Sequence, residues 1–393
     1  MILLSDVYYP FMCGVTRVVD IFRKELPKYD VKVSLFVPAP INKAYKIEER
    51  GSIDIILIKS WRLLGLYSEI KAPEIVSAYY SIRRYLENSL SDEDYIVIHS
   101  HSPYVIMSLL RLFGWRRGIR FPIIFTYHTL TKDYLEKRFG KLSKGFVMLD
   151  SVFLTNVIKR ASVVITPTDY AKDILLDSIP RAFKILKRKF VKIPNPIDRD
   201  KFTTPQKRAS DFFDFLEDYN YAIWVGRISH EKNIPFLMKI FSKLPYQLVI
   251  VGKGPLLSYM RKVAPKNVHL VGFVEEEVLK ALLHFARCFV ISNTFETLSL
   301  ATIEAMAQGV PIVSYYKGGY TEFLKHGKNG FIFRTLNEAR EYIKKLFTND
   351  ALREEMGKHA KETAMKFHPD VIIPKYLRLY KFFAKPLREL RAS

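Results

Sequence analysis

Cysteine is nearly absent from this chain of 393 residues, which contains only Cys13 and Cys288. Two cysteines form neither a disulfide framework nor a zinc site, so the composition is typical of a protein in a reducing cytosol. The sequence also lacks an apolar run of about 18 residues, the length that a membrane-spanning helix needs. Residues 1–10 have no basic flank or small-residue cleavage site, and they are better interpreted as a first strand than as a signal peptide.

Acidic residues are scarce relative to basic ones. The chain has 40 Asp and Glu against 62 Lys and Arg, for a net charge of +22. The excess is uneven, because residues 1–100 contain 13 residues of each sign whereas residues 101–196 contain 18 basic and 6 acidic ones. Such a patch attracts the phosphates of nucleic acid, anionic lipid or a nucleotide. A solvated lysine-rich surface has the same composition, so charge alone leaves these readings open.

The chain is long enough for two globular domains, and 49% of its residues are hydrophobic. Short β-branched runs alternate with polar or helical segments, which is typical of parallel sheets with crossover helices. The segment VKIPNPIDRDKF at 191–202 interrupts this alternation with two prolines. We therefore predict two βα sets joined near residue 200, followed by a basic helical segment at 371–390.

The segment VGRISHEKN at 225–233 places two cations at the end of a strand-like run. Gly226 allows a ligand to approach the backbone there, as expected at the carboxyl edge of a parallel sheet. Arg227 offers a planar fork of donors and Lys232 a mobile point charge, a combination that suits a diphosphate. An ordinary charged surface loop is the alternative that this segment alone leaves open.

Two glutamates, Glu296 and Glu304, lie where the apolar run at 288–292 gives way to a helical segment. The first amides of that helix, around Ser299 and Leu300, are free to bind an anion. Glu296 would repel a phosphate, so its carboxylate is better suited to accepting hydrogen bonds from hydroxyl groups. Glu304 lies further into the helix, where a buried carboxylate needs polar partners. A sugar and a ribose would satisfy them, whereas an exposed Glu296 and a lysine-paired Glu304 are the alternative.

In their order and spacing, these motifs resemble the retaining glycosyltransferases of family 4. In that family two glutamates separated by seven residues mark the donor site, as Glu296 and Glu304 are separated here. The resemblance covers nearly the whole chain. It includes YYPFMCGVTRVV at 8–19, HSHSP at 99–103, TYHT at 126–129, PNPID at 194–198, VGRISHEKN at 225–233, VGKGP at 251–255 and VHLVGFV at 268–274.

The resemblance implies an α/β chain with the GT-B fold, in which two Rossmann-like domains with doubly wound parallel sheets face each other across a cleft. We expect an acceptor-binding domain at 1–197 and a nucleotide-sugar-binding domain at 198–369. A C-terminal helix at 370–393 is expected to cross back to the N-terminal domain.

The same resemblance assigns roles to individual residues. Arg227 and Lys232 would hold the donor diphosphate and stabilise charge on the departing nucleotide. Glu296 would bind hydroxyls of the transferred sugar, Glu304 the ribose hydroxyls, and His128 would face the reacting sugar from the other domain. Arg227, Lys232, His128 and Glu296 thus form the expected catalytic set. The other donor contacts are expected from Gly14, Gly226, Gly254, Thr297, Leu298, Ser299 and Leu300.

Two positions depart from the family's pattern. The first loop usually has paired glycines where this chain has Cys13 and Gly14, and the glycine common before the donor helix is Ser299 here. Both glutamates and both cations are present, so we expect activity to be retained. Residues 198–200 form an Asp-x-Asp, but this motif lies far along the chain from the donor loops. We therefore expect neither a metal nor another cofactor.

The acceptor is expected to be a lipid or a lipid-linked glycan. TYHTLTKDY at 126–134 is similar to the corresponding segment of the family's diacylglycerol glucosyltransferases and related lipid-modifying members. Basic residues interleaved with aromatic ones are typical of a peripheral enzyme on anionic lipid, whereas no nucleic-acid-binding module is present. We thus expect a cytoplasmic enzyme at the inner face of the membrane. The basic residues are Arg111, Arg116, Arg117, Arg120, Lys132, Lys137, Arg138, Lys141 and Lys144.

The predicted activity is retaining transfer of a hexose from a nucleotide-sugar, with UDP favoured as the family's commonest base. Transfer to a soluble sugar or glycan, and epimerisation of a sugar nucleotide, are the alternatives. A non-catalytic binding protein would fit the charge but not the full donor constellation. A dinucleotide dehydrogenase is excluded because residues 252–254 lack the third glycine and the acidic partner. The sugar, the acceptor and the oligomeric state are not predicted.

Overall fold

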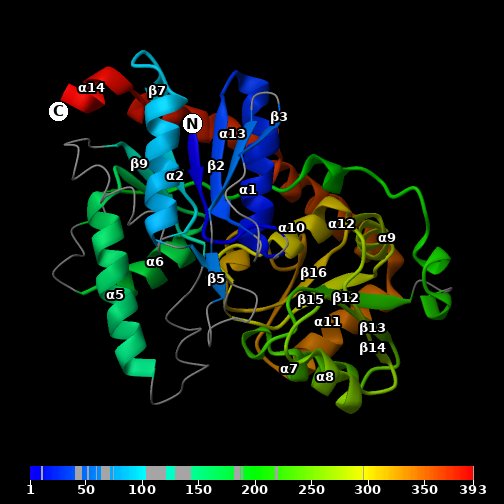
Figure 1. Cartoon of the computed structure of the whole chain (residues 1–393). Helices are drawn as coiled ribbons and strands as arrows, with labels where there is room; N and C mark the ends of the chain where they lie inside the picture. The colour runs from blue at the N-terminus through cyan, green and yellow to red at the C-terminus, as the bar shows by residue number, and fades with distance from the viewer. Residues whose placement is uncertain are drawn as a thin grey trace. The chain divides into compact units, whose positions relative to one another are not determined.

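The chain forms two compact units, each built around a parallel β-sheet (Figure 1). The first unit consists of the described residues up to Pro196 together with the segment from Ile372 onward, and the second consists mainly of Ile197–Val371. The ligand that each unit binds stays a prediction. The computed structural model describes residues 1–9, 12–39, 47–50, 53–58, 60–62, 71–73, 75–102, 121–128, 143–180, 186, 189–216, 220–294 and 296–392.

Eight of the described strands form the sheet of the first unit, in the order β11-β10-β9-β8-β1-β2-β4-β3. All neighbours are parallel except β3, which pairs antiparallel with β4 at one edge. The interior strands are buried apolar runs, as expected for a sheet covered on both faces. The strands are β1 (Ile2–Leu4), β2 (Val33–Pro38), β3 (Ile47–Arg50), β4 (Ile53–Ile58), β8 (Ile98–Ser100), β9 (Ile123–Thr126), β10 (Val163–Thr166) and β11 (Phe190–Lys192).

Helices and two short ladders complete the described part of the first unit. The side chain of Thr168 caps α6 by accepting a hydrogen bond of 3.0 Å from the backbone N–H of Ala171. The helices are α1 (Gly14–Glu25), α2 (Ile75–Asn88), α5 (Ser143–Arg160), α6 (Asp169–Ser178), α13 (Pro369–Phe383) and α14 (Leu387–Ala392). The ladders pair β5 (Ser60–Arg62) with β6 (Lys71–Pro73) and β7 (Tyr95–Ile96) with β18 (Lys385–Pro386).

The C-terminal segment is not one continuous helix, in contrast to the prediction for residues 371–390. Helix α13 ends at Phe383, and the strand β18 follows before α14 begins. Pro386 has no backbone N–H with which to continue a helix, and residues 385–386 pair with β7 instead. From Ile372 onward this segment belongs to the first unit, where Tyr380 of α13 is hydrogen-bonded to His99 at 2.8 Å.

The second unit has a six-stranded sheet among its described residues, in the order β14-β13-β12-β15-β16-β17, with all strands parallel. The order reverses between β12 and β15, and ligands of open α/β sheets bind at the carboxyl ends of strands at such a point. The strands are β12 (Tyr221–Val225), β13 (Gln247–Val251), β14 (Val268–Gly272), β15 (Cys288–Ile291), β16 (Ile312–Tyr315) and β17 (Gly330–Phe333). The α-helices are α7 (Ile234–Phe241), α8 (Leu257–Val263), α9 (Glu276–His284), α10 (Leu300–Ala307), α11 (Leu336–Thr348) and α12 (Asp350–Ala364).

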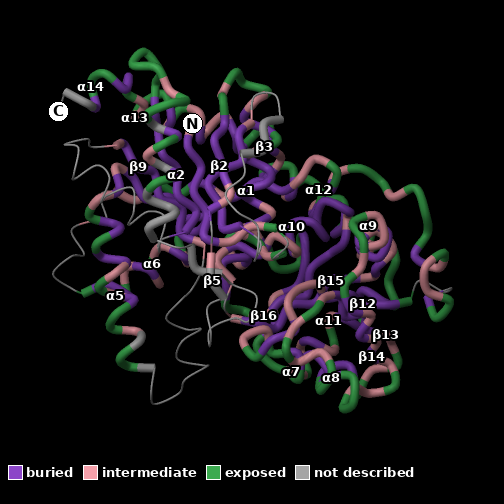
Figure 2. The backbone as a smooth tube through the Cα atoms, in the orientation of Figure 1, coloured by how far each residue is buried: buried purple, intermediate pink, exposed green. Residues whose placement is uncertain are grey.

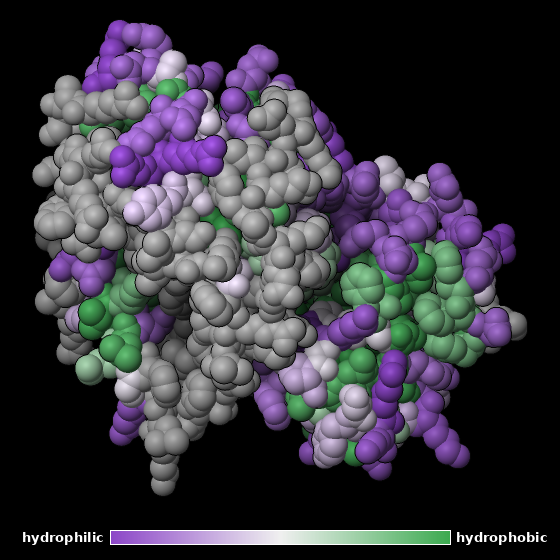
Figure 3. Space-filling model, in the orientation of Figure 1, coloured by the Kyte–Doolittle hydropathy of each residue, from purple (hydrophilic) through white to green (hydrophobic). Residues whose placement is uncertain are grey.

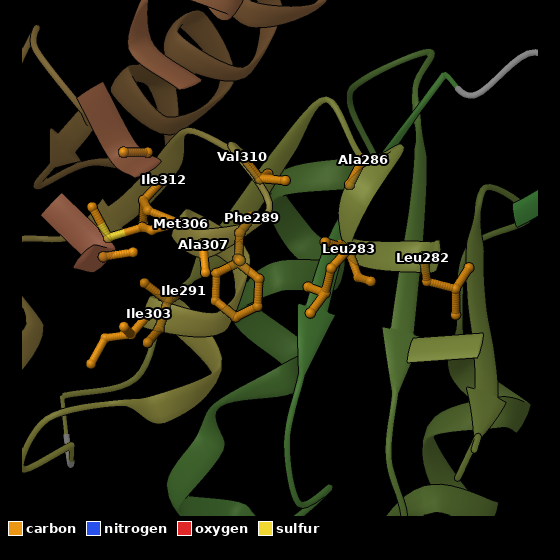
Figure 4. Close-up of a cluster of buried hydrophobic side chains, with 14 of the residues drawn as sticks. Leu282, Leu283, Ala286, Phe289, Ile291, Ile303, Met306, Ala307, Val310 and Ile312 are labelled. Atoms are coloured by element: carbon orange, nitrogen blue, oxygen red, sulfur yellow. The ribbon is translucent and has the colours of Figure 1, made fainter. Parts of the chain in front are cut away.

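A hydrophobic core holds α10 against the sheet of the second unit. Buried residues concentrate along the strands of each sheet (Figure 2). Figure 4 shows Phe289 and Ile291 of β15 in one buried cluster with Ile303 and Met306 of α10. This packing fixes both ends of the loop at 292–299, because β15 precedes the loop and α10 follows it.

Candidate functional site

The cations and the first glutamate of the predicted site lie at one edge of the second unit's sheet. Arg227 lies two residues after the end of β12, and Lys232 ends the adjoining 3-10 turn η7 (His230–Lys232). Glu296 lies in the loop that follows β15. Because β12 and β15 are neighbouring parallel strands, their carboxyl ends meet at the point where the strand order reverses.

Lys232 and Glu296 form an ion pair, which sequence reasoning did not predict. Lys232 Nζ pairs with Glu296 Oε1, and the side chains are 19% and 21% exposed. Asn293 Nδ2 donates a hydrogen bond of 3.0 Å to the same oxygen. Two residues predicted to bind different parts of a donor are therefore paired with each other in the structure.

The loop that contains Glu296 is held by a turn that follows β16. The backbone N–H of Gly319 donates a hydrogen bond of 2.8 Å to the backbone carbonyl of Glu296. The hydroxyl of Tyr320, a fully buried side chain, lies 2.7 Å from the carbonyl oxygen of Asn293 and donates a hydrogen bond to it. Sequence reasoning missed Asn293, Gly319 and Tyr320, although the glycine pair at 318–319 after a strand was a signal for a close backbone approach.

Two glycines are required by packing between neighbouring loops. Gly252 has φ +139°, and a Cβ atom there would lie 1.8 Å from the carbonyl oxygen of Gly226. A Cβ on Gly254 would lie 2.2 Å from the carbonyl oxygen of Ile228. The loops after β12 and β13 therefore touch through their backbones, which gives Gly254 a structural reason to be glycine. The predicted donor contacts of Gly226 and Gly254 stay predictions.

Helix α10 begins directly after Ser299, close to the predicted amide contacts. The side chain of Leu298 is buried in the core, whereas those of Thr297 and Leu300 are half-buried. Glu304 lies inside α10 and is only 3% exposed, so its carboxylate requires polar partners. The sugar, phosphate and ribose contacts assigned to these residues stay predictions.

Ser299 adopts a left-handed conformation, with φ 70° and ψ 83°. This region costs a side chain other than glycine about 1–2 kcal/mol. The Ser299 hydroxyl compensates in part through a contact of 2.8 Å with the Thr302 hydroxyl. The family's usual glycine at this position thus has a conformational explanation.

We expect Ser299→Gly to be more stable than Ser299→Ala by about 1–2 kcal/mol. Both variants lose the contact with Thr302, but only glycine relieves the strained backbone. Chemical denaturation of the two variants measures this difference in the free energy of unfolding. Equal stabilities would mean that the loop changes conformation when the hydroxyl is removed.

His128 lies two residues after the end of β9 and contacts two other motifs of the first unit. Its Nε2 lies 2.8 Å from His101 Nδ1, and its Nδ1 lies 3.4 Å from Asn195 Nδ2. Burial lowers the pKa of His128 to about 3, so its ring is neutral near pH 7. An amide N–H donated to Nδ1 places the ring proton of His128 on Nε2, from which it is donated to His101.

The histidines around His128 were not predicted to act together. Burial lowers the pKa of both His99 and His101 well below the usual value for histidine. His99 bridges Thr126 at 2.7 Å and Tyr380 at 2.8 Å, which anchors it in the first unit. The repeated His-x-His in HSHSP was a signal for this cluster, because alternate residues of a strand point to the same side.

Other predicted features have structural positions of their own. Gly14 is the exposed first residue of α1. Asp198 caps the 3-10 turn η4 (Arg199–Phe202) by accepting a hydrogen bond of 3.4 Å from the backbone N–H of Asp200, and Arg199 forms an ion pair with Asp370. The Asp-x-Asp therefore has a local structural use, and metal-free chemistry stays a prediction.

Of the basic residues predicted at 111–144, all except Lys144 lie outside the described residues.

None of the helices in the described part of the chain is both long and apolar enough to span a bilayer.

Comparisons with known proteins point to glycosyltransferases. The family model for Glycosyltransferase Family 4 matches residues 12–201, and the model for glycosyl transferases group 1 matches residues 206–363. The chain is 23% identical over 401 residues to the alpha-monoglucosyldiacylglycerol synthase of Acholeplasma laidlawii, covering 96% of each chain. It is 26% identical over 305 residues to the 2-deoxystreptamine N-acetyl-D-glucosaminyltransferase of Niallia circulans, covering 73% of this chain and 76% of that protein.

A solved structure shares the fold. HepE from Anabaena, in complex with UDP-glucose, superposes with a TM-score of 0.72. The superposition covers 97% of this chain and 98% of HepE, at 16% sequence identity. Because the match covers nearly the full length of both chains, it includes both parallel-sheet units of this chain.

Proposed function

The chain belongs to glycosyltransferase family 4 and has the GT-B fold, and from this premise we propose that it transfers a hexose from a UDP-sugar to a hydroxyl of a membrane lipid, with retention of anomeric configuration. The observation that carries the proposal is the meeting of Arg227, Lys232 and Glu296 at one sheet edge. UDP is supported by the UDP-glucose complex of HepE. A lipid acceptor is supported by the diacylglycerol-modifying name of the Acholeplasma relative.

The chemistry that we propose depends on charge stabilisation at the leaving group. As the glycosidic bond breaks, negative charge develops on the departing diphosphate. Arg227 and Lys232 offset that charge, and the first amides of α10 add further donors. With two protein cations available, the proposed reaction needs no metal. We assign no enzymic nucleophile, so the acceptor attacks from the side that the nucleotide leaves and the donor phosphate takes its proton.

His128 is proposed to orient the sugar and not to exchange protons with it. With a pKa of about 3 its ring stays neutral across the physiological range, and a neutral imidazole is a poor proton donor. His101 and Asn195 hold the ring in one orientation from its two nitrogens. By this proposal, catalysis depends on where the His128 ring is held and not on its charge.

Membrane contact is proposed through α5, where an exposed helical stripe is apolar. Met148, Leu149 and Val152 are 66%, 65% and 51% exposed, and their spacing places them on one face of the helix. Figure 3 shows hydrophobic atoms at the surface in the region of α5. Exposed faces of helices are normally polar, and Lys144 and Lys159 on the same face suit the headgroups of anionic lipid.

We expect the triple variant Met148→Ser, Leu149→Ser and Val152→Ser to bind anionic liposomes at least about tenfold more weakly. The variant loses apolar area that would enter the acyl boundary, but it leaves the donor residues intact. Cosedimentation with phosphatidylglycerol vesicles measures the binding. Val263→Ser with Met365→Ser is a matched control, because these residues are 50% and 49% exposed in the second unit. Equal loss in both variants would contradict a specific role for α5.

The activity is tested with purified protein and a panel of UDP- and GDP-sugars in EDTA. Diacylglycerol-containing vesicles are added to one half of the reactions. Nucleotide release that rises with the lipid and produces an α-linked glycolipid would establish the proposal, including its independence of metal. Donor conversion without any acceptor would indicate an epimerase instead.

A soluble acceptor is a second candidate. It is favoured by the Niallia relative, whose name specifies an aminocyclitol acceptor. Nucleotide release that ignores lipid but rises with 2-deoxystreptamine or a soluble glycan would support this candidate.

A further inference from the structure

The Lys232–Glu296 ion pair sets two donor-binding functions in competition. By the proposed function, on which this inference rests, Lys232 binds the diphosphate and Glu296 binds the hydroxyls of the transferred sugar. In the structure the two groups neutralise each other. Neither is deeply buried, at 19% and 21% exposure, so ligand groups have access to replace either partner.

A complete donor would give each side chain of the ion pair a new partner at the same time. Its diphosphate takes Lys232, and its sugar hydroxyls donate hydrogen bonds to the Glu296 carboxylate. The hydrogen bond from Asn293 to Glu296 Oε1 does not depend on Lys232, so Asn293 holds the carboxylate in place during the exchange. The backbone bond from Gly319 holds the main chain of Glu296 in the same way.

A nucleoside diphosphate without a sugar would give a new partner to Lys232 but not to Glu296. It takes Lys232, but it brings no hydroxyl group to the sugar position. Glu296 then keeps its negative charge close to the diphosphate, with Asn293 as its remaining donor in the described contacts. A buried or half-buried charge that loses its partner is unfavourable, and two like charges at short range repel each other.

We propose that the Lys232–Glu296 ion pair discriminates the donor from the product nucleotide. Glu296 thus has two effects of opposite sign, because it strengthens binding of the sugar donor and weakens binding of the diphosphate that remains after transfer. The second effect favours release of the product. Asn293 acts as the positioning residue that holds the Glu296 carboxylate in place while Lys232 exchanges that carboxylate for the diphosphate.

The test is the binding of UDP and of a non-reacting UDP-sugar analogue to Glu296→Gln. We expect UDP to bind about 3–10-fold more tightly than to the wild type, because Lys232 no longer has a competing carboxylate. The UDP-sugar analogue should lose affinity relative to UDP, because a neutral amide is a weaker acceptor for hydroxyls. A purely structural role for Glu296 would weaken both ligands together.

Glu231→Gln is the matched control. Glu231 is the residue before Lys232, and its carboxylate accepts a hydrogen bond of 2.5 Å from the Ser229 hydroxyl and not from Lys232. Glu231→Gln removes one negative charge, as Glu296→Gln does, but it removes it from the turn that contains Lys232. If Glu231→Gln tightens UDP binding as much as Glu296→Gln does, the effect is one of net charge and the proposal is overturned.

A double-mutant cycle of Lys232→Gln and Glu296→Gln separates the coupling between these two residues from the structural effect of each single substitution. In the background of Lys232→Gln, Glu296→Gln should tighten UDP binding by less than it does in the wild type, because the competition for Lys232 is gone and only the repulsion between Glu296 and the diphosphate remains. Isothermal titration calorimetry at fixed salt measures all four proteins. The same tightening with and without Lys232 would overturn the inference.

Failure of the inference and failure of the proposed function give different results. Wild-type protein that transfers sugar but shows no tightening in Glu296→Gln overturns the inference alone. Wild-type protein that binds none of UDP, GDP and ADP overturns the proposed function and the inference with it.

Discussion

Replacement of Arg227 with Gln is expected to lower kcat for sugar transfer by about 10²–10³-fold. The guanidinium lies at the carboxyl end of β12, where the strand order reverses, and it offers two parallel donors to a diphosphate. Its contribution grows as charge develops on the leaving group, so the rate should fall more than donor affinity does. Steady-state kinetics with calorimetric donor binding separates the two effects.

A lysine at this position is expected to recover only part of the rate, because it restores the charge without the fork. Arg287→Gln is the matched control. Arg287 pairs with the exposed Asp350 in the same unit, so its loss removes an equal charge away from the donor edge. A fall of the same size in both variants, or no fall in Arg227→Gln, would contradict the assigned role.

Replacement of Gly319 with Ala is expected to lower kcat/KM by at least about 100-fold. A Cβ atom on Gly319 would lie 2.0 Å from the carbonyl oxygen of Thr297 and 3.0 Å from that of Glu296. Both neighbours are backbone atoms, so the loop that contains Glu296 must shift. We also expect a loss of about 1–3 kcal/mol in the free energy of unfolding. Thermal unfolding and kinetics of the purified variant measure both effects.

Gly327→Ala separates stability from function. Gly327 has φ +76° and open space around its Cβ position, so alanine there costs backbone strain of about 1–2 kcal/mol without a clash. We expect this control to lose stability and to keep its kinetic constants. Normal kinetics in Gly319→Ala would mean that the position of the Glu296 loop does not limit the reaction.

Many strands were predictable from the sequence, and two of those that were missed, β4 and β17, have physical explanations. The apolar runs that became β1, β2, β8, β9 and β10 in the first unit, and β12 to β16 in the second, stand out in the sequence. Strand β4 contains the charged Asp54, which is buried in the sheet because Tyr85 donates a hydrogen bond of 3.1 Å to it. Strand β17 begins with Gly330, where a Cβ would lie 2.3 Å from the carbonyl oxygen of Ile312. Neither a buried partner nor a close backbone approach is visible in a local pattern.

The candidate site was predictable in its residues but not in its contacts. Spacing and residue type indicated Arg227, Lys232 and Glu296, and the parallel sheet brings them to one edge. The ion pair between Lys232 and Glu296 depends on the order of β12 and β15, which residue spacing does not determine.

The surroundings of His128 depend on contacts over still longer separations. Asn195 is 67 residues from His128, and Tyr380 is 281 residues from His99. Such pairs are properties of the folded chain and leave no local signal in the sequence.

The return of the C-terminal segment to the first unit has a consequence for synthesis on the ribosome. Domains usually fold in the order in which they emerge. Here the second unit is nearly continuous, and Ile197–Val371 can fold once it has emerged. The first unit must wait for α13, because Tyr376 and Tyr380 fill its interior beside Phe22 and His99. The part of the chain that is made first is therefore completed last, and until then its aromatic core is open to chaperones.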